Sequence, residues 1–558
     1  MLDSLGVGTE FTTRGWREFL LVCAFGTVLA VALTYPFASQ MDRVGRFENS
    51  DGQFSIWNVS WVARTIVVEP SKLFDANIFY PHQKALTFSE HNLAAGIMAV
   101  PVYWATRNPY LALNFVFLAA MVLSVAGGYY LVRYLTNDRR AALLAGICFA
   151  FCPYIFGRTS HIQLLLTAGL PFSLLAFHRM ADHPTALRGA ILGLVVAAQA
   201  TASGYYAILT VLLVAFATMI VAATRRLWTD AAYWRAVAAA AAVTLACVVP
   251  LFVPYLQLQR ETGFERPLNE AAIYSADWRA YLASSAIGHR WMLGLIGRWN
   301  EVLFPGFVAT IGGIAGAWVG WRRGGRTRET AILYGSLAIV AGWASLGPDA
   351  GLYSALYHSV PVLAWLRAPA RFGIAVVLGL SVLAGLAISQ WLPRARHANA
   401  IAAVVIAIAA AELTTPLRFR EVAPFASAYD VLATLPPGPV IELPFPSRSA
   451  DLHGHAKYML RSTTHWMPLI NGYSDYIPPD FAERANVLRG FPSREAFRVL
   501  AAAPPRYAVF HPRWYHNQEL LNARLKEFAS CLRPIHTEGP AHLYEVLDCA
   551  LTASNSAD

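Results

Sequence analysis

The residues best suited to chemistry lie in one hydrophilic loop that follows the first apolar segment. Asp51, His82, Glu90 and His91 fall within SDGQFSIWNVSWVART and IFYPHQKALTFSEHN. Ionisable groups held beside membrane-spanning segments lose hydration, so few are kept without a partner or a task. A carboxylate can take a proton from a hydroxyl group, and an imidazole can hydrogen-bond a polar substrate. We therefore expect this loop to carry a functional site.

A second set of candidates is cationic and follows later apolar segments. Arg158 and His161 occur in FGRTSHIQLL, and Arg367 and Arg371 occur in LRAPARFG. A guanidinium group is well shaped to hold a phosphate through two parallel hydrogen bonds. Acids and arginines gathered at one membrane face suit a reaction in which a base deprotonates a hydroxyl group while cations hold a phosphate leaving group.

Ordinary structural roles compete with these interpretations. Asp51 stands in an Asp-Gly pair, which often marks a turn or a helix start. A lone histidine such as His161 is more often a hydrogen-bonded structural residue than a ligand, and Arg371 could extend to lipid head groups. Tyr205 and Tyr206, in SGYY, could line a sugar pocket, although interfacial tyrosines usually belong to an aromatic belt.

Signatures of metal, nucleotide and serine-hydrolase chemistry are absent from the sequence. There is no DxD, HExxH, paired CxxC, Walker loop or GxSxG motif. We therefore expect no required cofactor and predict no metal ligands. A divalent cation between Asp51 and Glu90 stays open as an alternative, although nothing in their spacing favours it.

The composition identifies the class of protein. Of the 558 residues, 56% are hydrophobic and 14% are charged, and the mean hydropathy is +0.42. A soluble globular protein has about a quarter of its residues charged. The net charge of +10 comes from arginines in short clusters between apolar runs, a pattern of membrane topology and not of nucleic-acid binding. The chain is predicted to be an integral membrane protein.

Apolar runs of roughly 17 to 25 residues can cross a bilayer, and about eleven such runs are present. The short loops between them alternate in charge, with pairs such as Arg139 and Arg140 or Arg225 and Arg226 in every second loop. By the positive-inside rule these loops and the N-terminus are cytoplasmic. The runs are centred near Val28, Leu118, Phe149, Pro171, Val195, Leu213, Thr244, Gly313, Ile339, Leu380 and Ile406.

The first outer loop, residues 39–92, is predicted to contain helices that lie in the membrane interface. Phe54, Trp57 and Trp61 recur at helical spacing, so the two tryptophans are expected to be membrane anchors. The following run, 93–106, is apolar but short and contains Pro101. Counting it as a crossing would invert all later loops, so we interpret it as a re-entrant element beside a cavity.

The composition changes after residue 417, where charges and prolines return. VIELPF and RYAVFH look like buried strands on either side of a helical stretch over 481–500, and a helix is expected over 519–528. We predict a membrane domain over 1–417 and a small outer α/β domain over 418–558. Cys531 and Cys549 flank a predicted strand pair in an oxidising compartment, which favours a disulfide between them.

This layout resembles the GT-C superfamily of membrane glycosyltransferases. The resemblance covers the whole architecture, and its local match lies in SDGQFSIWNVSW, IFYP with SEHN, GRTSHIQLL and LRAPARFG. It implies a sugar donor linked to polyprenyl phosphate and a glycan, lipid or protein acceptor at the outer face of a bacterial plasma membrane. The chain lacks the DxD and WWD-type motifs of metal-dependent oligosaccharyltransferases. Their absence argues against transfer of an oligosaccharide to a protein.

The resemblance also implies residue roles. Asp51 is the candidate base in an inverting transfer, with Glu90 as a second acid that orients the acceptor. Phosphate ligands are expected among Arg158, Arg367 and Arg371, which would have to converge with Asp51 on one cavity. The remaining predicted substrate-binding residues are His82, His91, His161, Tyr205 and Tyr206.

Two functions of other classes are compatible with the same residues. A transporter or flippase of a lipid-linked or polar solute would place ionisable groups in the middle of its spans. The sequence places few there, Glu412 being the main exception. A non-catalytic scaffold would use the C-terminal domain to bind polysaccharide, with the loop acid vestigial.

Overall fold

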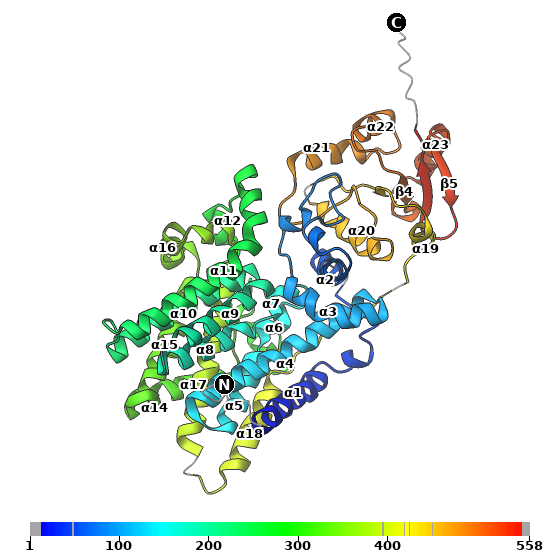
Figure 1. Cartoon of the computed structure of the whole chain (residues 1–558). Helices are drawn as coiled ribbons and strands as arrows, with labels where there is room; N and C mark the ends of the chain where they lie inside the picture. The colour runs from blue at the N-terminus through cyan, green and yellow to red at the C-terminus, as the bar shows by residue number, and fades with distance from the viewer. Residues whose placement is uncertain are drawn as a thin grey trace. The chain divides into compact units, whose positions relative to one another are not determined.

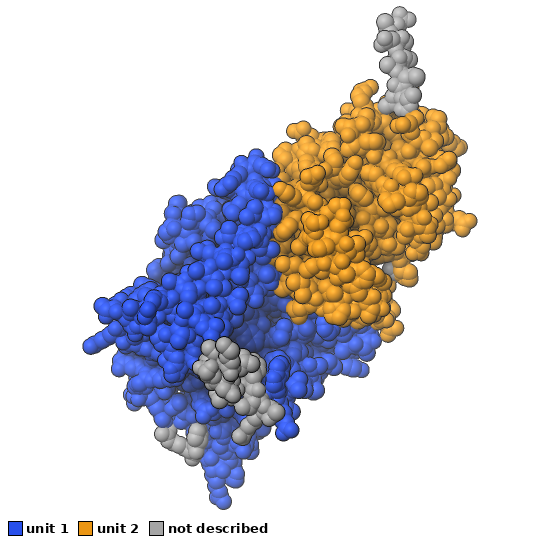
Figure 2. Space-filling view, in the orientation of Figure 1, with its two compact units in different colours: residues 1–41, 114–418 blue, residues 42–113, 419–558 orange. Residues whose placement is uncertain are grey.

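The structure is a computed structural model that describes residues 13–46, 49–392, 395–417, 419–422, 424–448 and 450–548. Helices dominate, and strands occur chiefly near the C-terminal end of the chain (Figure 1). Contacts divide the chain into two compact units, coloured separately in Figure 2. Unit 1 comprises residues 1–41 and 114–418, and unit 2 comprises residues 42–113 and 419–558. The loop predicted to belong with the membrane spans therefore packs with the C-terminal tail.

Unit 1 is built from apolar helices. Seven described helical segments are long and apolar enough to cross a membrane, and each of the eleven apolar runs predicted from the sequence contains a helix. The chain is a multi-pass membrane protein, whereas the number of crossings and their sidedness stay predictions. The principal helices are α1 Thr13–Leu33, α4 Pro109–Thr136, α5 Arg139–Ala150, α6 Pro153–Gly157, α7 Ile162–Leu165, α8 Gly169–Asp182, α9 Ala186–Ala202, α10 Gly204–Arg225, α11 Ala231–Thr262, α14 Phe307–Arg323, α15 Gly325–Ser345, α17 Gly373–Trp391 and α18 Ala398–Glu412.

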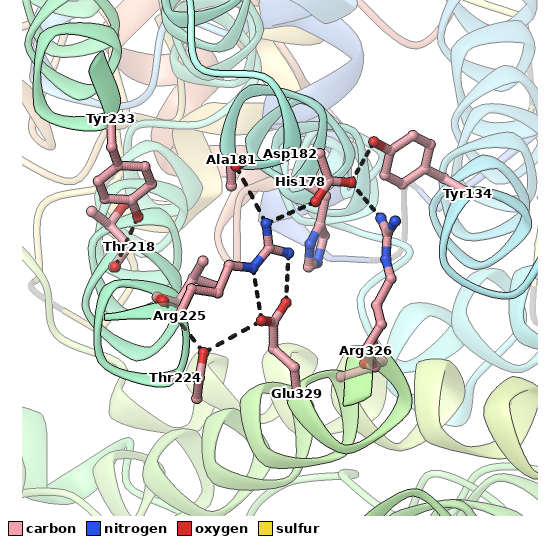
Figure 3. Close-up of polar contacts among 12 residues, drawn as sticks. Tyr134, His178, Ala181, Asp182, Thr218, Thr224, Arg225, Tyr233, Arg326 and Glu329 are labelled. Carbon is pink, nitrogen blue, oxygen red and sulfur yellow. Dashed lines mark hydrogen bonds and ion pairs between the residues drawn. The ribbon is translucent and has the colours of Figure 1, made fainter. Parts of the chain in front are cut away.

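A polar network joins the ends of four of these helices (Figure 3). The Arg225 guanidinium pairs with Glu329 at 2.6 Å and with Asp182 at 2.9 Å. Arg326 also pairs with Asp182, and Tyr134 donates its hydroxyl to the same carboxylate at 2.6 Å. These side chains come from the ends of α4, α8 and α10 and the start of α15. The arginines that predict the cytoplasmic face therefore also hold helix ends together.

Glu412 is the main ionisable residue within a predicted span, and its contacts give it a structural role. Its carboxylate accepts backbone N–H groups of Phe307 and Val308 at the start of α14, the latter at 3.1 Å. It also bonds the buried His289 ring at 2.9 Å. A negative charge at a helix N-terminus satisfies orphan N–H donors and the helix dipole. Glu412 therefore caps α14 from the end of α18.

Unit 2 contains a four-stranded sheet with the order β3-β4-β6-β5. The strands are β3 Val440–Leu443, β4 Tyr507–Phe510, β5 Leu532–His536 and β6 His542–Val546. β3 and β4 are parallel, with Val440 opposite Tyr507, while β4, β6 and β5 run antiparallel. Every residue of β3 and β4 is buried, as expected for strands covered on both faces. The strands predicted from VIELPF and RYAVFH and the strand pair predicted after Cys531 are all present.

The helical part of the tail differs from its prediction in one place. The stretch expected to be helical over 481–500 forms two helices, α21 Pro479–Leu488 and α22 Arg494–Leu500. Pro492 has no N–H to donate and disfavours helical geometry in the residue before it. Ser493 then starts α22 by accepting the backbone N–H of Ala496 at 3.2 Å. The helix expected over 519–528 is α23 Gln518–Glu527.

The two tryptophans expected to be membrane anchors lie instead inside unit 2. They belong to α2 Ser50–Val68, where Trp57 is fully buried and Trp61 is 6% exposed. The indole of Trp57 donates to Asn77, and that of Trp61 donates to the Leu73 carbonyl. Their apolar faces meet other residues of unit 2, because α2 packs against α3 Leu93–Thr106 and against α20 Ala456–Arg461 of the tail.

The first loop and the tail share backbone hydrogen bonds. The tail segment around Leu469 lies beside β3 through a parallel bridge from Val440 to Leu469. Residues of the loop then pair with this segment: Leu469 N donates to Asn77 O, and Tyr80 N donates to Leu469 O, both at 2.8 Å. Phe79 N donates to Asn471 O at 3.1 Å. The loop thus continues the hydrogen-bonding pattern of the tail sheet beyond β3.

Two further features fix this arrangement. Gly472 approaches the Phe79 ring so closely that a Cβ atom at residue 472 would lie 2.5 Å from it. A short strand pair, β1 Val44–Gly45 with β2 Arg420–Glu421, joins the start of the loop to the start of the tail. Of the predicted disulfide pair, Cys531 is buried at the edge of the sheet and Cys549 lies outside the described residues, so the pairing stays a prediction.

Asn77 provides a test of the connection between loop and tail. Its buried amide accepts from Trp57 and donates to Ser462 and to the Met467 carbonyl, each at 3.1 Å. Asn77→Ala leaves those buried groups without their partner, so we expect the free energy of unfolding to fall by about 2 kcal/mol or more. Thermal unfolding and limited proteolysis of the detergent-solubilised protein measure this, with the exposed Gln83→Ala as the matched control. Equal stability of the two variants would contradict the assignment.

Candidate functional site

Asp51 lies in the first turn of α2 and is half-buried. It is not the N-cap, because the Asn49 side chain accepts the Gly52 N–H at 2.9 Å in that role. A Cβ atom at residue 52 would lie 1.5 Å from the Arg46 carbonyl oxygen. The Asp-Gly pair therefore reflects a close approach of backbone to a helix start and not a hairpin turn. The Asp51 side chain therefore stands at the N-terminal end of α2 without capping it.

Glu90 reaches the same face of α2. The buried Asn58 side chain donates to the Glu90 carbonyl oxygen at 3.0 Å. Asn58 follows Asp51 by seven residues, which is about two helical turns or roughly 10 Å along the axis. Asn58 thus holds the Glu90 backbone beside α2, about two turns from Asp51.

His91 is a buried member of this segment. Its side chain is 2% exposed, and its Nδ1 atom accepts the Leu93 N–H at 3.0 Å at the start of α3. Burial lowers the His91 pKa from 6.5 to about 4, because the charged imidazolium loses hydration. Asn92 adopts a left-handed conformation with φ of 49°, which turns the chain into α3. His91 is therefore neutral near pH 7, as a structural histidine or a hydrogen-bonding ligand would be.

Two tail segments approach the loop residues and were missed by sequence reasoning. The His82 ring bonds Asp480 at 3.1 Å. Ser89, next to Glu90, donates to Asp475 at 3.2 Å. Asp475 thus adds a carboxylate beside the segment that carries Glu90, although it follows Glu90 by hundreds of residues in the chain. Nothing in the local sequence around Asp475 distinguishes it from a solvated loop acid.

Unit 1 gathers four of the predicted substrate-binding residues in one polar cluster. Arg158 lies over the Tyr154 ring at 5.2 Å, and the Tyr154 and Tyr206 hydroxyls are 3.1 Å apart. The Arg371 guanidinium lies over the Tyr205 ring at 4.8 Å. Both guanidinium groups act electrostatically on the hydroxyls of Tyr154, Tyr205 and Tyr206. Arg158, Tyr205, Tyr206 and Arg371 are therefore neighbours.

The two arginines of this cluster differ in their charge partners. Arg158 forms an ion pair with Glu301, a residue that sequence reasoning did not select. Within the described parts of the chain, no carboxylate pairs with Arg371. Its segment is held in place because Tyr205 donates its hydroxyl to the Ala368 carbonyl. Arg371 therefore keeps an uncompensated positive charge on a fixed backbone.

Arg367 and His161, the remaining predicted ligands of unit 1, have other partners. Arg367 is 3.8 Å from Glu270 and lies over the Tyr274 ring at 5.2 Å. Glu270 also pairs with Arg266 at 2.9 Å, so Arg367 shares its acid with another arginine. His161 is half-buried at the start of α7, and its backbone N–H donates to the Arg158 carbonyl at 2.9 Å. His161 is therefore fixed next to the cluster through Arg158.

The described residues contain no group of three or more histidine, cysteine, aspartate or glutamate side chains arranged to hold a metal ion. Whether a divalent cation takes part stays untested.

The fold matches solved membrane glycosyltransferases. The chain is similar to the arabinofuranosyltransferase AftD from Mycobacteria over 95% of its own length, with a TM-score of 0.57 and 14% sequence identity. It spans 40% of the length of that protein. It is also similar to ArnT from Cupriavidus metallidurans bound to undecaprenyl phosphate, with a TM-score of 0.50, 14% identity and coverage of 96% of this chain and 99% of that one.

Both of these proteins are GT-C glycosyltransferases, so the predicted GT-C fold is confirmed. At 14% identity the likeness concerns the fold and does not transfer individual residues. No family model matches the sequence, and no curated protein matches it.

The burial of His91 generates a prediction about pH. Its pKa is about 4 in the folded protein and 6.5 as an ordinary histidine, so below about pH 6.5 the unfolded chain binds protons that the folded one does not. Stability should therefore fall as the pH drops from about 6.5 to about 4, by at most about 3 kcal/mol from this residue. His455 and His465, with pKa values lowered to about 3 by burial, act in the same direction.

Thermal unfolding midpoints recorded between about pH 7 and about pH 4 test this prediction. His91→Gln should give a shallower fall of the midpoint than the unchanged protein. An exposed histidine of unit 2, His516→Gln, is the control and should leave the slope unaltered. Parallel curves for His91→Gln and the unchanged protein would show that His91 does not titrate as described.

Proposed function

We propose that the protein is a glycosyltransferase that moves a sugar from a polyprenyl-phosphate donor to an acceptor hydroxyl group, with inversion at the anomeric carbon. The observation that carries this proposal is the GT-C fold, which extends over 95% of the chain in the comparison with an arabinofuranosyltransferase. The ArnT structure contains undecaprenyl phosphate, which supports a donor of the same lipid class.

The acids of unit 2 fit the acceptor side of this reaction. Asp51 is the proposed base, since it is a half-buried carboxylate at a helix start that another residue caps. Glu90 is the proposed second acid, which accepts hydrogen bonds from the acceptor and orients it. Asp475, joined to the loop through Ser89, is a further candidate for this orienting role.

The cations of unit 1 fit the phosphate side. Arg371 is the strongest candidate, because its charge has no carboxylate partner in the part of unit 1 that the structure describes. Arg158 is weaker as a ligand, because Glu301 already compensates its charge. Arg367 shares Glu270 with Arg266, so the proposal gives it the smallest part.

The proposed chemistry is a single displacement. The acceptor oxygen attacks the anomeric carbon, the bond from that carbon to the phosphate oxygen breaks, and Asp51 takes the acceptor proton. The products are the glycoside and free polyprenyl phosphate, which keeps the electron pair of the broken bond. Attack and departure occur on opposite faces of the sugar, which inverts the configuration at the anomeric carbon.

The charge distribution favours an enzyme over a transporter. In the seven described candidate spans, the aspartate, glutamate, lysine and arginine residues lie near the helix ends and not in the middle. A path for a polar solute needs such groups near the bilayer centre. The Asp182 network and Glu412 are used instead to join helix ends.

Asp51→Asn tests the base. The variant keeps the size of the side chain and loses the proton acceptor, so we expect transfer from a polyprenyl-phosphate sugar to fall by at least about a hundredfold. The thermal midpoint should stay close to that of the unchanged protein. Glu69→Gln, an exposed acid of the same loop, is the matched control and should retain activity. Full activity of Asp51→Asn would remove Asp51 from this role.

Substitutions of Arg371 test its proposed role as a ligand of the donor phosphate. Arg371→Ala removes the uncompensated cation, so we expect a loss of about a hundredfold or more in kcat/KM. Arg371→Lys restores the charge without the fork geometry and should recover only part of this loss. The control is Arg279→Ala, an exposed arginine of unit 1. If Arg371→Ala retained its affinity for undecaprenyl phosphate in a direct binding assay, the assignment would be wrong even if turnover fell.

A further inference from the structure

Unit 2 contains a cavity that the proposed reaction does not use. Its volume is about 650 Å3, within the roughly 300 to 1,000 Å3 range of small-molecule sites. All of its lining residues belong to unit 2, and they come from residues 42–43, from α2 and α3, from residues 107–110 at the start of α4, and from the tail. Neither Asp51 nor Glu90 lines it.

The lining is rich in positive charge. Three arginines, Arg43, Arg64 and Arg107, contribute to it, against the single carboxylate of Asp42. In the part of the chain that the structure describes, none of these arginines forms an ion pair. Uncompensated guanidinium groups that share one cavity repel each other, and an anion between them relieves this repulsion.

A cavity of unit 1 shows the contrasting case. It has a volume of about 950 Å3 and is lined by Arg133, Arg139 and Arg140. Glu18 pairs with the first two of these arginines at 3.3 and 2.9 Å, and Asp138 pairs with Arg140 at 2.8 Å. Acids of the protein thus compensate the arginines of that cavity, whereas the arginines of the unit 2 cavity form no ion pair with any described residue.

Aromatic rings complete the wall of the unit 2 cavity. The Trp466 indole donates to the Tyr103 hydroxyl at 3.1 Å, and Arg64 lies over the Trp466 ring at 5.6 Å. Arg64 and Arg107 both act electrostatically on the Tyr103 hydroxyl, so the two guanidinium groups converge there. Trp466 holds a left-handed backbone conformation, φ of 56°, which is costly for a bulky residue. Thr463 and Thr464 add hydroxyl groups to the lining.

We propose that this cavity binds a sugar that carries a phosphate group. The arginines suit the phosphate through bidentate hydrogen bonds, and the aromatic faces suit the apolar C–H face of a sugar ring. The threonine hydroxyls can bond the sugar hydroxyls. Such a group can belong to a soluble glycan or to the head group of a glycophospholipid. This site does not depend on the transferase assignment, because it is defined by binding and not by turnover.

Isothermal titration of the detergent-solubilised full chain with glucose 1-phosphate tests the proposal. We expect saturable binding of glucose 1-phosphate, at least tenfold weaker binding of glucose and of inorganic phosphate alone, and weakening with added salt. Arg107→Gln should reduce the affinity for glucose 1-phosphate at least tenfold, and Arg64→Gln with Arg107→Gln should reduce it further. The Arg107 side chain is exposed, so its variant should fold, and Arg513→Gln is the matched control in unit 2.

A competition experiment distinguishes a soluble glycan from a glycophospholipid head group as the carrier of the phosphorylated sugar. Displacement of glucose 1-phosphate by a short-chain phosphatidylinositol assigns the site to lipid head groups, and failure to displace it assigns the site to a soluble glycan. Unchanged affinity in Arg107→Gln and in the double variant, or equal affinity for glucose and glucose 1-phosphate, would falsify the proposal. Asp51→Asn should bind glucose 1-phosphate normally, so failure of the transferase proposal and failure of this one are separable.

Discussion

The pairing of the first outer loop with the C-terminal tail is the constraint on which unit 2 depends. Backbone N–H and C=O groups of residues 77–80 bond to residues 469–471, which in turn lie beside β3. A buried sheet edge cannot leave these groups unpaired without a large desolvation cost. The loop therefore supplies partners that the four-stranded sheet lacks on its own. Residues hundreds of positions apart in the sequence thus fold as one unit.

This pairing explains why the acids of the loop are held firmly. Asn77 connects α2 to the tail, and Asn58 connects α2 to the segment of Glu90. Asp51 is thereby placed on a helix whose middle residues, 55–63, are packed in the core of unit 2. A base needs such support, because catalytic geometry is lost with displacements of about an ångström.

Arginines serve three different purposes in this chain. In unit 1, Arg225 and Arg326 are compensated by acids and join helix ends, whereas Arg371 has no carboxylate partner among the described residues. In unit 2, Arg64 and Arg107 lie on aromatic rings around a cavity without an ion pair in the described structure. Charge compensation, and not the presence of arginine, separates the structural arginines from the candidate ligands.

The sequence by itself determined the class of protein, the positions of the apolar helices and the strands of the tail, because these depend on local composition and periodicity. It also drew attention to Arg158, Tyr205, Tyr206 and Arg371, which the tertiary structure places together. The burial of Trp57 and the contact of Asp475 with Ser89 were decided only by tertiary structure. A tryptophan stripe has the same pattern in a membrane interface and in a protein core, and the partner that buries it lies hundreds of residues away. Pairing between distant segments leaves no local signal in the sequence. The hydrogen bonding between loop and tail could therefore not be predicted from either segment alone.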